Sequence, residues 1–237
     1  GSGATAVTVV PAMADKADHV TMLQRSPTYV VALPGTDKIT GFLMKWLPMS
    51  VVYPMVRWRN LKVHHLLYSL SKKWPAKMRN FFLKGMKKQL PDPEQQKHFE
   101  PTYAPWDQRL CAVPDGDLFH AIRDGKASVI TDHIERFTET GILLKSGATL
   151  EADIVVSATG LNLQLAGGMD IEVDGQQWQP KEVMAYKATM IQNAPNLGVI
   201  LGYTNWPWTL KADIASRYLC RVINHMDEHG YTQATPI

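Results

Sequence analysis

The first six residues are the feature that most limits how this chain can fold. They read Gly1-Ser2-Gly3-Ala4-Thr5-Ala6 and match the pattern G-x-G-x-x-A. In a βαβ unit this pattern forms a tight turn that follows a buried strand and approaches the pyrophosphate of a dinucleotide. No strand precedes Gly1 here. We therefore expect a piece of a larger nucleotide-binding protein, and the motif alone leaves an ordinary terminal loop as the alternative.

Each small residue of this motif has a physical role in the predicted turn. Gly1 permits the tight turn, Gly3 lets the backbone approach a phosphate, and Ala6 lets the following helix pack on a sheet. We expect that helix to start near Ala4 and to direct its free N–H groups and positive dipole end at the phosphate. The candidate cofactor-binding residues of the turn are therefore Gly1, Ser2, Gly3, Ala4 and Thr5.

The residues that follow predict which dinucleotide binds. Residues 6–14 are small and apolar, as a helix against a sheet should be, and residues 20–23 read as a short buried strand. Many NAD-binding folds carry an acid about twenty residues after the glycines, where it binds the ribose 2′-hydroxyl. Here Arg25 and Ser26 follow the strand, and they suit the 2′-phosphate of NADP because a guanidinium binds phosphate in a bidentate manner. A solvated surface arginine is the alternative for Arg25.

Composition places the chain among globular proteins. Its 237 residues are 45% hydrophobic and 20% charged, enough for one large or two small domains. Cys111 and Cys220 follow no motif spacing, so we expect no disulfide framework and a reducing, cytoplasmic location.

The positive charge is concentrated in one segment. Residues 38–88 contain twelve Lys or Arg and no Asp or Glu, while the whole chain carries +3. The rest of the chain therefore carries −9, the difference between +3 and +12. Eight aromatic residues lie between these cations. We expect several helices in this segment, broken by Pro48, Pro54, Pro75 and Pro91.

Basic helices with interleaved aromatic residues suit a membrane surface or a nucleic acid. No stretch of eighteen apolar residues is free of charge and proline, so nothing in the sequence predicts a bilayer-spanning helix. We predict a helical insertion with solvated lysines, or peripheral membrane contact through residues 38–88, and no nucleic-acid partner. A non-enzymatic membrane-binding module built on the same residues is a further alternative.

The second half predicts short strands that end in turns. Residues 118–123 form an expected helix that ends at Asp124-Gly125, and residues 129–131, 134–138 and 142–144 read as strands. Residues 152–157 are expected to form a fully buried strand that leads to a turn at Ala158-Thr159-Gly160, and residues 197–202 repeat this design. A helix over residues 208–229 follows, with Gly230 as its C-terminal cap.

Several motifs in a fixed order now carry a resemblance. The segments GSGATA, QRSP, WDQRL, DGDLF, ADIVVSATG and GYTN resemble the flavin-dependent Baeyer–Villiger monooxygenases, which are class B flavoprotein monooxygenases, and in particular the ethionamide-activating subgroup. The resemblance implies an α/β fold: a Rossmann-like NADPH-binding domain with a helical insertion, and the C-terminal part of an FAD-binding domain. The implied boundaries are 1–36 for the first half of the NADPH domain, 37–105 for the insertion, 106–160 for the remainder and crossing strands, and 161–237 for the FAD part.

The resemblance also implies a chemistry. In this family NADPH reduces FAD, O₂ adds to give a C4a-peroxyflavin, and this species oxygenates a ketone, or a sulfur or nitrogen atom such as that of a thioether or thioamide. Another NAD(P)H-dependent flavoprotein oxidoreductase is the alternative.

The resemblance assigns roles to particular residues. Arg109 resembles the arginine that stabilises the peroxyflavin, although it could simply pair with Asp107 or Asp115. Trp206 and Trp208 could wall the substrate pocket or pack in a core. The implied FAD-binding residues are Ala158, Thr159, Gly160, Thr204 and Asn205.

One rival motif lies near the C-terminal end. His225-Met226-Asp227-Glu228-His229 matches H-x-x-E-H, the zinc motif of inverted metallopeptidases. It lies at a helix end with little chain left for a third ligand, and a histidine there is already favoured by the helix dipole. We expect no metal at this site.

Overall fold

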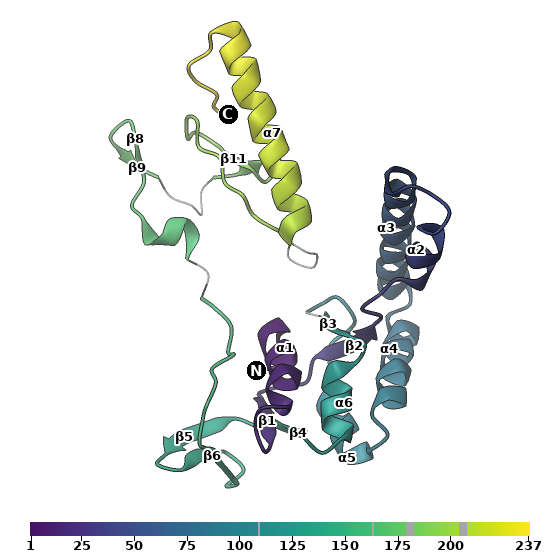
Figure 1. The fold of residues 1–237 in the computed structure, drawn as a ribbon. Helices are drawn as coiled ribbons and strands as arrows, with labels where there is room; N and C mark the ends of the chain where they lie inside the picture. Colours follow the sequence, from purple (N-terminus) through teal and green to yellow (C-terminus); the bar gives the residue numbers. More distant parts are fainter. Residues whose placement is uncertain (109, 163, 179–182, 204–207) are drawn as a thin grey trace. The chain divides into compact units, whose positions relative to one another are not determined.

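The fold is described from a computed structural model, for residues 1–108, 110–162, 164–178, 183–203 and 208–237. The chain divides into two compact units, Gly1–Gly160 and Leu161–Ile237. The first unit alternates helices with strands, whereas the second combines short hairpins with one long helix (Figure 1).

The first unit begins as the sequence predicts. Helix α1 (Ala4–Ala14) starts directly after the glycine turn. Strand β1 (Val20–Gln24) pairs in parallel with β4 (Ala127–Thr131), and β2 (Tyr29–Leu33) pairs in parallel with β3 (Leu110–Pro114). Parallel strands connected through helices define an α/β fold, so the predicted class is confirmed.

The basic segment is helical, as predicted. Its elements, with the short ones that follow it, are α2 (Lys38–Leu43), α3 (Met49–Lys73), α4 (Pro75–Gln89), α5 (Pro93–Gln96) and the 3₁₀ helix η1 (Lys97–Phe99). Pro48, Pro75 and Pro91 lie at helix boundaries. The predicted break at Pro54 is wrong, because α3 continues through it. A proline in the second turn removes one internal hydrogen bond, and the carbonyl it leaves belongs to the exposed Ser50, where water can reach it.

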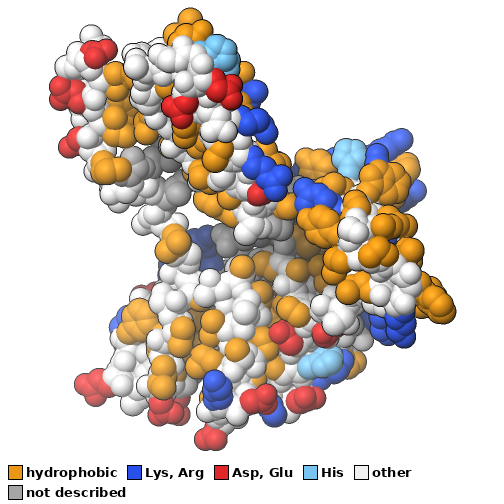
Figure 2. All heavy atoms as spheres, turned by 45° about the horizontal axis from the view of Figure 1, so that its top comes forward, with side chains coloured by type: hydrophobic (Ala, Val, Ile, Leu, Met, Phe, Trp, Pro, Cys, Tyr) orange, Lys and Arg blue, Asp and Glu red, His pale blue; other side chains and the backbone are white. Residues whose placement is uncertain are grey.

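Helix α3 is exposed over most of its surface. Val52 and Ser71 are its only buried residues. Figure 2 shows hydrophobic side chains with Lys and Arg among them over the part of the molecule formed by α2 and α3. No helix in the described ranges is long and apolar enough to cross a bilayer.

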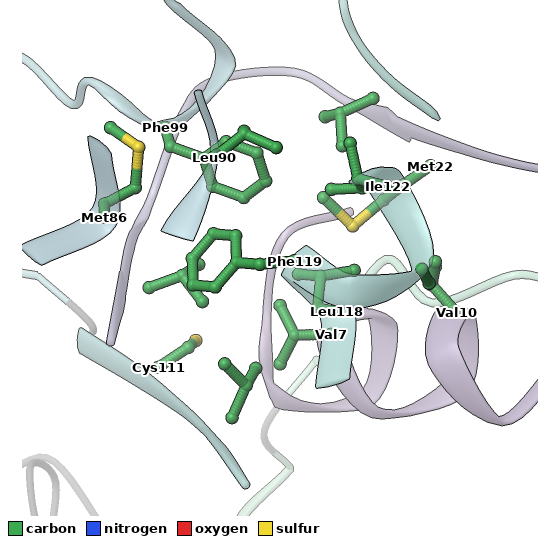
Figure 3. Close-up of a cluster of buried hydrophobic side chains, with 14 of the residues drawn as sticks. Val7, Val10, Met22, Met86, Leu90, Phe99, Cys111, Leu118, Phe119 and Ile122 are labelled. Carbon is green, nitrogen blue, oxygen red and sulfur yellow. The ribbon is translucent and has the colours of Figure 1, made fainter. Parts of the chain in front are cut away.

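The core of the first unit lies between α1, α4, the strands and helix α6 (Asp117–Arg123). Figure 3 shows Val7 and Val10 of α1 in the same cluster as Leu118 and Phe119 of α6. Leu118 and Phe119 are fully buried. The ring of Phe119 meets that of Phe99 edge to face, with centroids 5.4 Å apart. Burying each such side chain contributes about 1.5–3 kcal/mol, so this cluster holds α1, and with it the glycine turn, against the strands.

A small antiparallel sheet follows β4. It consists of β5 (Ile134–Thr138), β6 (Gly141–Leu144) and β7 (Thr149–Glu151), in that order. The strands predicted at 134–138 and 142–144 are present, and α6 ends at Asp124-Gly125 as expected.

Two predicted buried strands are wrong. Residues 152–157 form no strand, and Ile154, Val155 and Val156 are exposed. Residues 197–202 contribute a single bridge, from Gly198 to Met190. An apolar run becomes a buried strand only where a neighbouring strand satisfies its backbone and a second layer covers its side chains. Within the described residues the first run has no such neighbours, and the second pairs only over its first residues, where the Val199 N–H donates to the Thr189 carbonyl at 2.7 Å.

The second unit contains short elements and one long helix. They are η2 (Leu165–Gly168), β8 (Glu172–Val173), β9 (Gln176–Gln177), β10 (Ala185–Tyr186), β11 (Met190–Ile191) and α7 (Trp208–His229). Gly230 caps α7 as predicted: it has a φ of 67°, and the N–H of Tyr231 donates to the carbonyl of Met226 at 2.9 Å. Lys211, in the first turn of α7, donates to the Lys187 carbonyl at 3.0 Å and so ties the helix to the β10–β11 hairpin.

Candidate cofactor-binding site

The glycine turn lies between the two pairs of parallel strands. The main-chain nitrogen of Gly1 donates to the carbonyl of Leu23 near the end of β1, at 2.6 Å. The Ser2 carbonyl accepts from Sγ of Cys111 in β3 at 3.6 Å. The turn is therefore anchored on both pairs, close to the carboxyl end of β1. Ligands of open α/β sheets bind at carboxyl strand ends, at the point where the strand order reverses.

The N-terminal end of α1 is open to an anion. Gly3 is its N-cap, with an extended backbone, and no described side chain caps the helix. The first turn contains no acidic residue. The first internal hydrogen bond runs from the N–H of Val7 to the Gly3 carbonyl, so the N–H groups of Ala4 and Thr5 stay free within the helix. Free N–H groups at the positive end of a helix dipole form a binding site for phosphate.

Ser2 connects the glycine turn to the segment after β1. Its Oγ lies 3.2 Å from the Ser26 carbonyl and 2.8 Å from Oγ1 of Thr28. The structure thus brings the glycine turn next to the residues that we expect to select NADP. Thr28 was missed from the sequence, although a polar residue between Pro27 and the apolar run of β2 was the available signal.

Arg25 and Ser26 are exposed at the end of β1. Arg25 makes no hydrogen bond or ion pair with any residue that the structure describes. Its guanidinium is therefore accessible to an anionic ligand, and the same exposure fits the alternative of a solvated arginine.

The turn also touches the segment that leads out of the first unit. A Cβ atom placed on Gly1 would lie 2.3 Å from the carbonyl oxygen of Ala158, so this backbone contact requires a glycine. Gly160 has a φ of 90°, a conformation that side chains disfavour. Two segments singled out in the sequence, Gly1–Ala6 and Ala158–Gly160, are thus in direct contact.

A polar network supports the end of β1 beneath Arg25. The buried Gln24 donates from Nε2 to the His98 carbonyl at 2.6 Å and to Oγ1 of Thr131 at 2.9 Å. Nδ1 of His98 lies 2.7 Å from the same Thr131 hydroxyl. Burial, with the positive charge of Lys97, lowers the pKa of His98 below its usual value. No sequence motif pointed to this network, because its members come from β1, β4 and η1.

Other predicted site residues lie outside the described ranges. These are Arg109, Thr204 and Asn205, together with Trp206. The carboxylates considered as alternative partners of Arg109 have contacts of their own: Asp107 pairs with Lys72 at 2.8 Å, and Asp115 accepts from the Gly35 N–H at 2.9 Å. Trp208 is exposed and lies against Gly202.

The H-x-x-E-H motif forms a compact cluster at the end of α7. Potential ligand atoms of His225, Glu228 and His229 lie within 4.8 Å of one another, and all three residues are exposed. Nδ1 of His229 is already hydrogen-bonded to the His225 carbonyl at 2.9 Å. The expectation that no metal binds here stays a prediction.

Comparison with known proteins decides the family. No family model matches the chain. Among curated proteins, it is 55% identical over 233 residues to the FAD-containing monooxygenase EthA of Mycobacterium tuberculosis, covering 98% of this chain and 48% of EthA. It is 52% identical over 237 residues to the probable FAD-binding monooxygenase AlmA of Acinetobacter baylyi, covering 100% of this chain and 48% of AlmA. The chain belongs to the FAD-containing monooxygenases. It spans about half the length of these relatives.

Solved structures agree on the fold of this chain. OTEMO in an FAD-bound form superposes with a TM-score of 0.75 at 16% identity, over 100% of this chain and 53% of OTEMO. Open cyclohexanone monooxygenase gives a TM-score of 0.71 at 16% identity, over 97% and 54%. The predicted fold of a flavoprotein with two dinucleotide-binding domains is therefore confirmed, as is the predicted family. The predicted domain boundaries within it stay a prediction.

Proposed function

We propose that the full-length protein carrying this chain is an NADPH- and FAD-dependent monooxygenase. It inserts one oxygen atom of O₂ into a ketone, or adds it to a sulfur or nitrogen atom of a substrate such as a thioether or thioamide. Its curated relatives are named FAD-containing monooxygenases, and one solved neighbour, at a TM-score of 0.68, is an OTEMO complex with FAD and NADP. The observation that carries the proposal is the glycine turn, which Ser2 ties to the Arg25-Ser26 segment beside an uncapped helix end.

The residues fit a bound NADPH. Main-chain N–H groups of Ser2, Gly3, Ala4 and Thr5 would hold the pyrophosphate, while Gly1 shapes the turn and keeps its N–H on the Leu23 carbonyl. Arg25 and Ser26 would hold the 2′-phosphate. Neither the first turn of α1 nor the four residues after Leu23 contain an acid that would repel these anions. When bound, NADPH supplies the hydride. The protein orients it, because the turn is fixed by hydrogen bonds to both strand pairs.

Ala158, Thr159 and Gly160, with Thr204 and Asn205, are the residues that we propose for FAD. Residues 158–160 fit a cofactor contact because they belong to no helix or strand, and because Gly160 has a positive φ. When bound, the flavin supplies the redox chemistry with O₂. We propose that Arg109 stabilises negative charge that develops during oxygen activation, since an arginine stays protonated and cannot give that charge a proton.

Oxygen labelling separates this proposal from its alternative, another NAD(P)H-dependent flavoprotein oxidoreductase. The full-length protein would be supplied with FAD, NADPH and isotopically labelled O₂, together with a panel of ketones and thioethers. We expect one labelled oxygen atom in the product for each NADPH oxidised. If NADPH is oxidised while labelled oxygen appears only as hydrogen peroxide for every substrate, the alternative is correct.

A cytoplasmic location with peripheral membrane contact through residues 38–88 also stays a proposal. This segment forms helices with exposed apolar and basic side chains. No nucleic acid is among the partners that we propose.

A further inference from the structure

Helix α2 and the first half of α3 expose an unusual number of large apolar side chains. We call the exposed residues between Lys38 and Lys62 the α2–α3 surface (Figure 2). On it, Trp46 is 77% exposed, Trp58 64% and Phe42 62%. Contiguous apolar patches of this kind on a protein surface mark contacts with a partner or a membrane.

A groove between α2 and α3 continues the apolar surface. It has a volume of about 500 Å³ and is lined by apolar side chains of both helices, among them Ile39, Leu43 and Met55. Arg59 is the only charged residue among the described ones that line it. A groove of this kind suits hydrocarbon better than a polar ligand.

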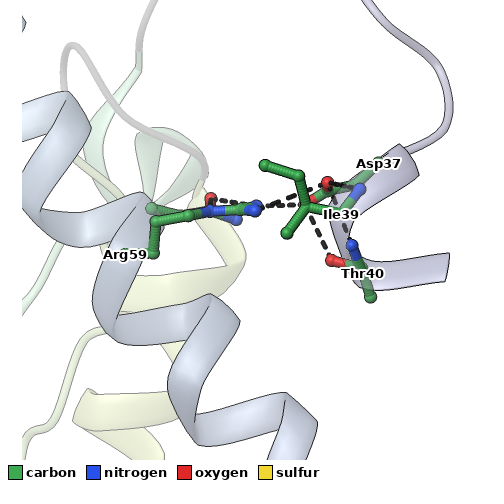
Figure 4. Close-up of polar contacts among 5 residues, drawn as sticks. Asp37, Ile39, Thr40 and Arg59 are labelled. Atoms are coloured by element: carbon green, nitrogen blue, oxygen red, sulfur yellow. Dashed lines mark hydrogen bonds and ion pairs between the residues drawn. The ribbon is translucent and has the colours of Figure 1, made fainter. Parts of the chain in front are cut away.

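The charge of Arg59 is neutralised within the protein. Its guanidinium forms an ion pair with Asp37, the N-cap of α2, which also accepts hydrogen bonds from the N–H groups of Ile39 and Thr40 at 3.0 and 3.2 Å (Figure 4). The hydrogen bonds from Arg59 and Thr40 hold the pKa of Asp37 well below its usual range. The pair therefore fixes α2 against α3 and leaves no unpaired charge at the groove.

The remaining cations of the segment are largely unpaired. Of the twelve Lys and Arg in residues 38–88, only Arg59, Lys72 and Lys87 form ion pairs with described residues. Lys38 and Lys45 lie beside the exposed apolar residues of the α2–α3 surface, and Nζ of Lys62 lies 5.7 Å from the Trp58 ring centre. Such a surface attracts an anionic partner, and it disfavours a second copy of itself because like charges would face each other.

We propose that the α2–α3 surface docks on an anionic phospholipid membrane. Trp46, Trp58 and Phe42 insert at the level of the headgroups, while Lys38, Lys45 and Lys62 contact lipid phosphates. The groove favours a membrane over a nucleic acid, because apart from Arg59 and the Trp58 ring its described lining is aliphatic. A nucleic acid is held by aromatic stacking and phosphate contacts and offers nothing to fill a hydrocarbon groove. This docking is independent of the proposed oxygenation chemistry.

Vesicle binding by the full-length protein tests the proposal. Co-sedimentation would be measured with phosphatidylserine-containing and with pure phosphatidylcholine vesicles, at low and high salt. We expect binding to the anionic vesicles alone, weakened by salt, with a blue shift of tryptophan emission. Each lysine near an anionic surface is worth about a five-fold change in affinity, so Lys38→Gln/Lys45→Gln should weaken binding about 25-fold. Lys16→Gln/Lys145→Gln, which removes two exposed lysines elsewhere in the first unit, should leave it within about two-fold.

Several outcomes would overturn the docking. The docking is contradicted if the protein binds both vesicle types equally, or if the two double variants have equal effects. It is also contradicted if no binding occurs at low salt, which would mean that another part of the full-length protein covers this surface. Self-association that Trp46→Ser abolishes, without vesicle binding, would assign the surface to a second copy. Single-stranded nucleic acid bound more tightly than anionic vesicles would assign it to that partner. Oxygenation activity, measured in parallel without lipid, should be unchanged in Lys38→Gln/Lys45→Gln, so failure of docking is separable from failure of the proposed function.

Discussion

Replacement of Arg25 by alanine tests cofactor selection most directly. Arg25 is exposed and has no partner among the described residues, so its removal should leave the stability of the folded protein within about 0.5 kcal/mol. The loss should appear only when a 2′-phosphate is present. Hydrogen bonds to charged groups contribute about 1.5–3 kcal/mol, which corresponds to a loss of about 10- to 150-fold in NADPH affinity. NADH lacks the 2′-phosphate, so its affinity should change less than about two-fold.

The assay is equilibrium binding of NADP⁺ and NAD⁺ to the full-length protein, followed by kcat/KM with NADPH and NADH. Arg25→Lys should recover part of the loss, because an ammonium keeps the charge but not the planar fork. Arg136→Ala is the matched control, since Arg136 is an exposed arginine of the same unit on β5. A similar loss for NADP⁺ and NAD⁺, or a similar loss in the control, would show that Arg25 does not contact the 2′-phosphate.

Substitutions at three other positions test the site. Gly1→Ala places a Cβ against the Ala158 carbonyl, so it should lower the free energy of unfolding of the full-length protein by about 1–3 kcal/mol in urea titrations; an unchanged midpoint would contradict the contact. The pKa of His98 is lowered from its ordinary value of 6.5, so neutral His98 stabilises the fold at pH values above 6.5. This stabilisation is lost as the pH falls below 6.5 toward the folded-state pKa. Urea midpoints should therefore fall on acidification. If the midpoint of His98→Gln falls with pH as steeply as that of the unsubstituted protein, His98 is not the cause of the pH dependence. Arg109→Ala should abolish product formation while NADPH still reduces FAD more slowly, and Arg109→Lys should recover part of it; stopped-flow absorbance with product analysis would show whether the two steps separate.

Local signals predicted the elements that depend on local chemistry. The sequence predicted α1 and α7 because each is a run of helix-compatible residues with a glycine at one end, Gly3 before α1 and Gly230 after α7. Neither signal depends on a distant part of the chain. The sequence was insufficient for β2 and β3. Each is a five-residue strand: β2 is flanked by Pro27 and Pro34, and β3 ends in Pro114. The strand character of both comes from parallel pairing across the whole basic insertion.

In the candidate site, too, the sequence predicted what depends on local spacing and missed what depends on long-range contacts. The glycine turn and Arg25-Ser26 could be found from spacing, because the turn and the end of the following strand are tied to one supersecondary unit. The contact of Gly1 with Ala158, and the network of Gln24, His98 and Thr131, join residues far apart in the chain. Only the packing of α1 and η1 on the strands brings them together, so no local pattern could reveal them.

The hydroxyl group of Ser2 has a fixed proton direction, and this limits how Ser2 can meet a phosphate. A carbonyl only accepts hydrogen bonds, so the contact with Ser26 uses the single proton of the Ser2 hydroxyl. The contact with Thr28 must then have Thr28 as its donor. While both contacts persist, the Ser2 side chain has no proton left to give to a phosphate oxygen. Ser2 can donate to the pyrophosphate only through its main-chain N–H, and its side chain serves to keep the turn in the shape that directs that N–H.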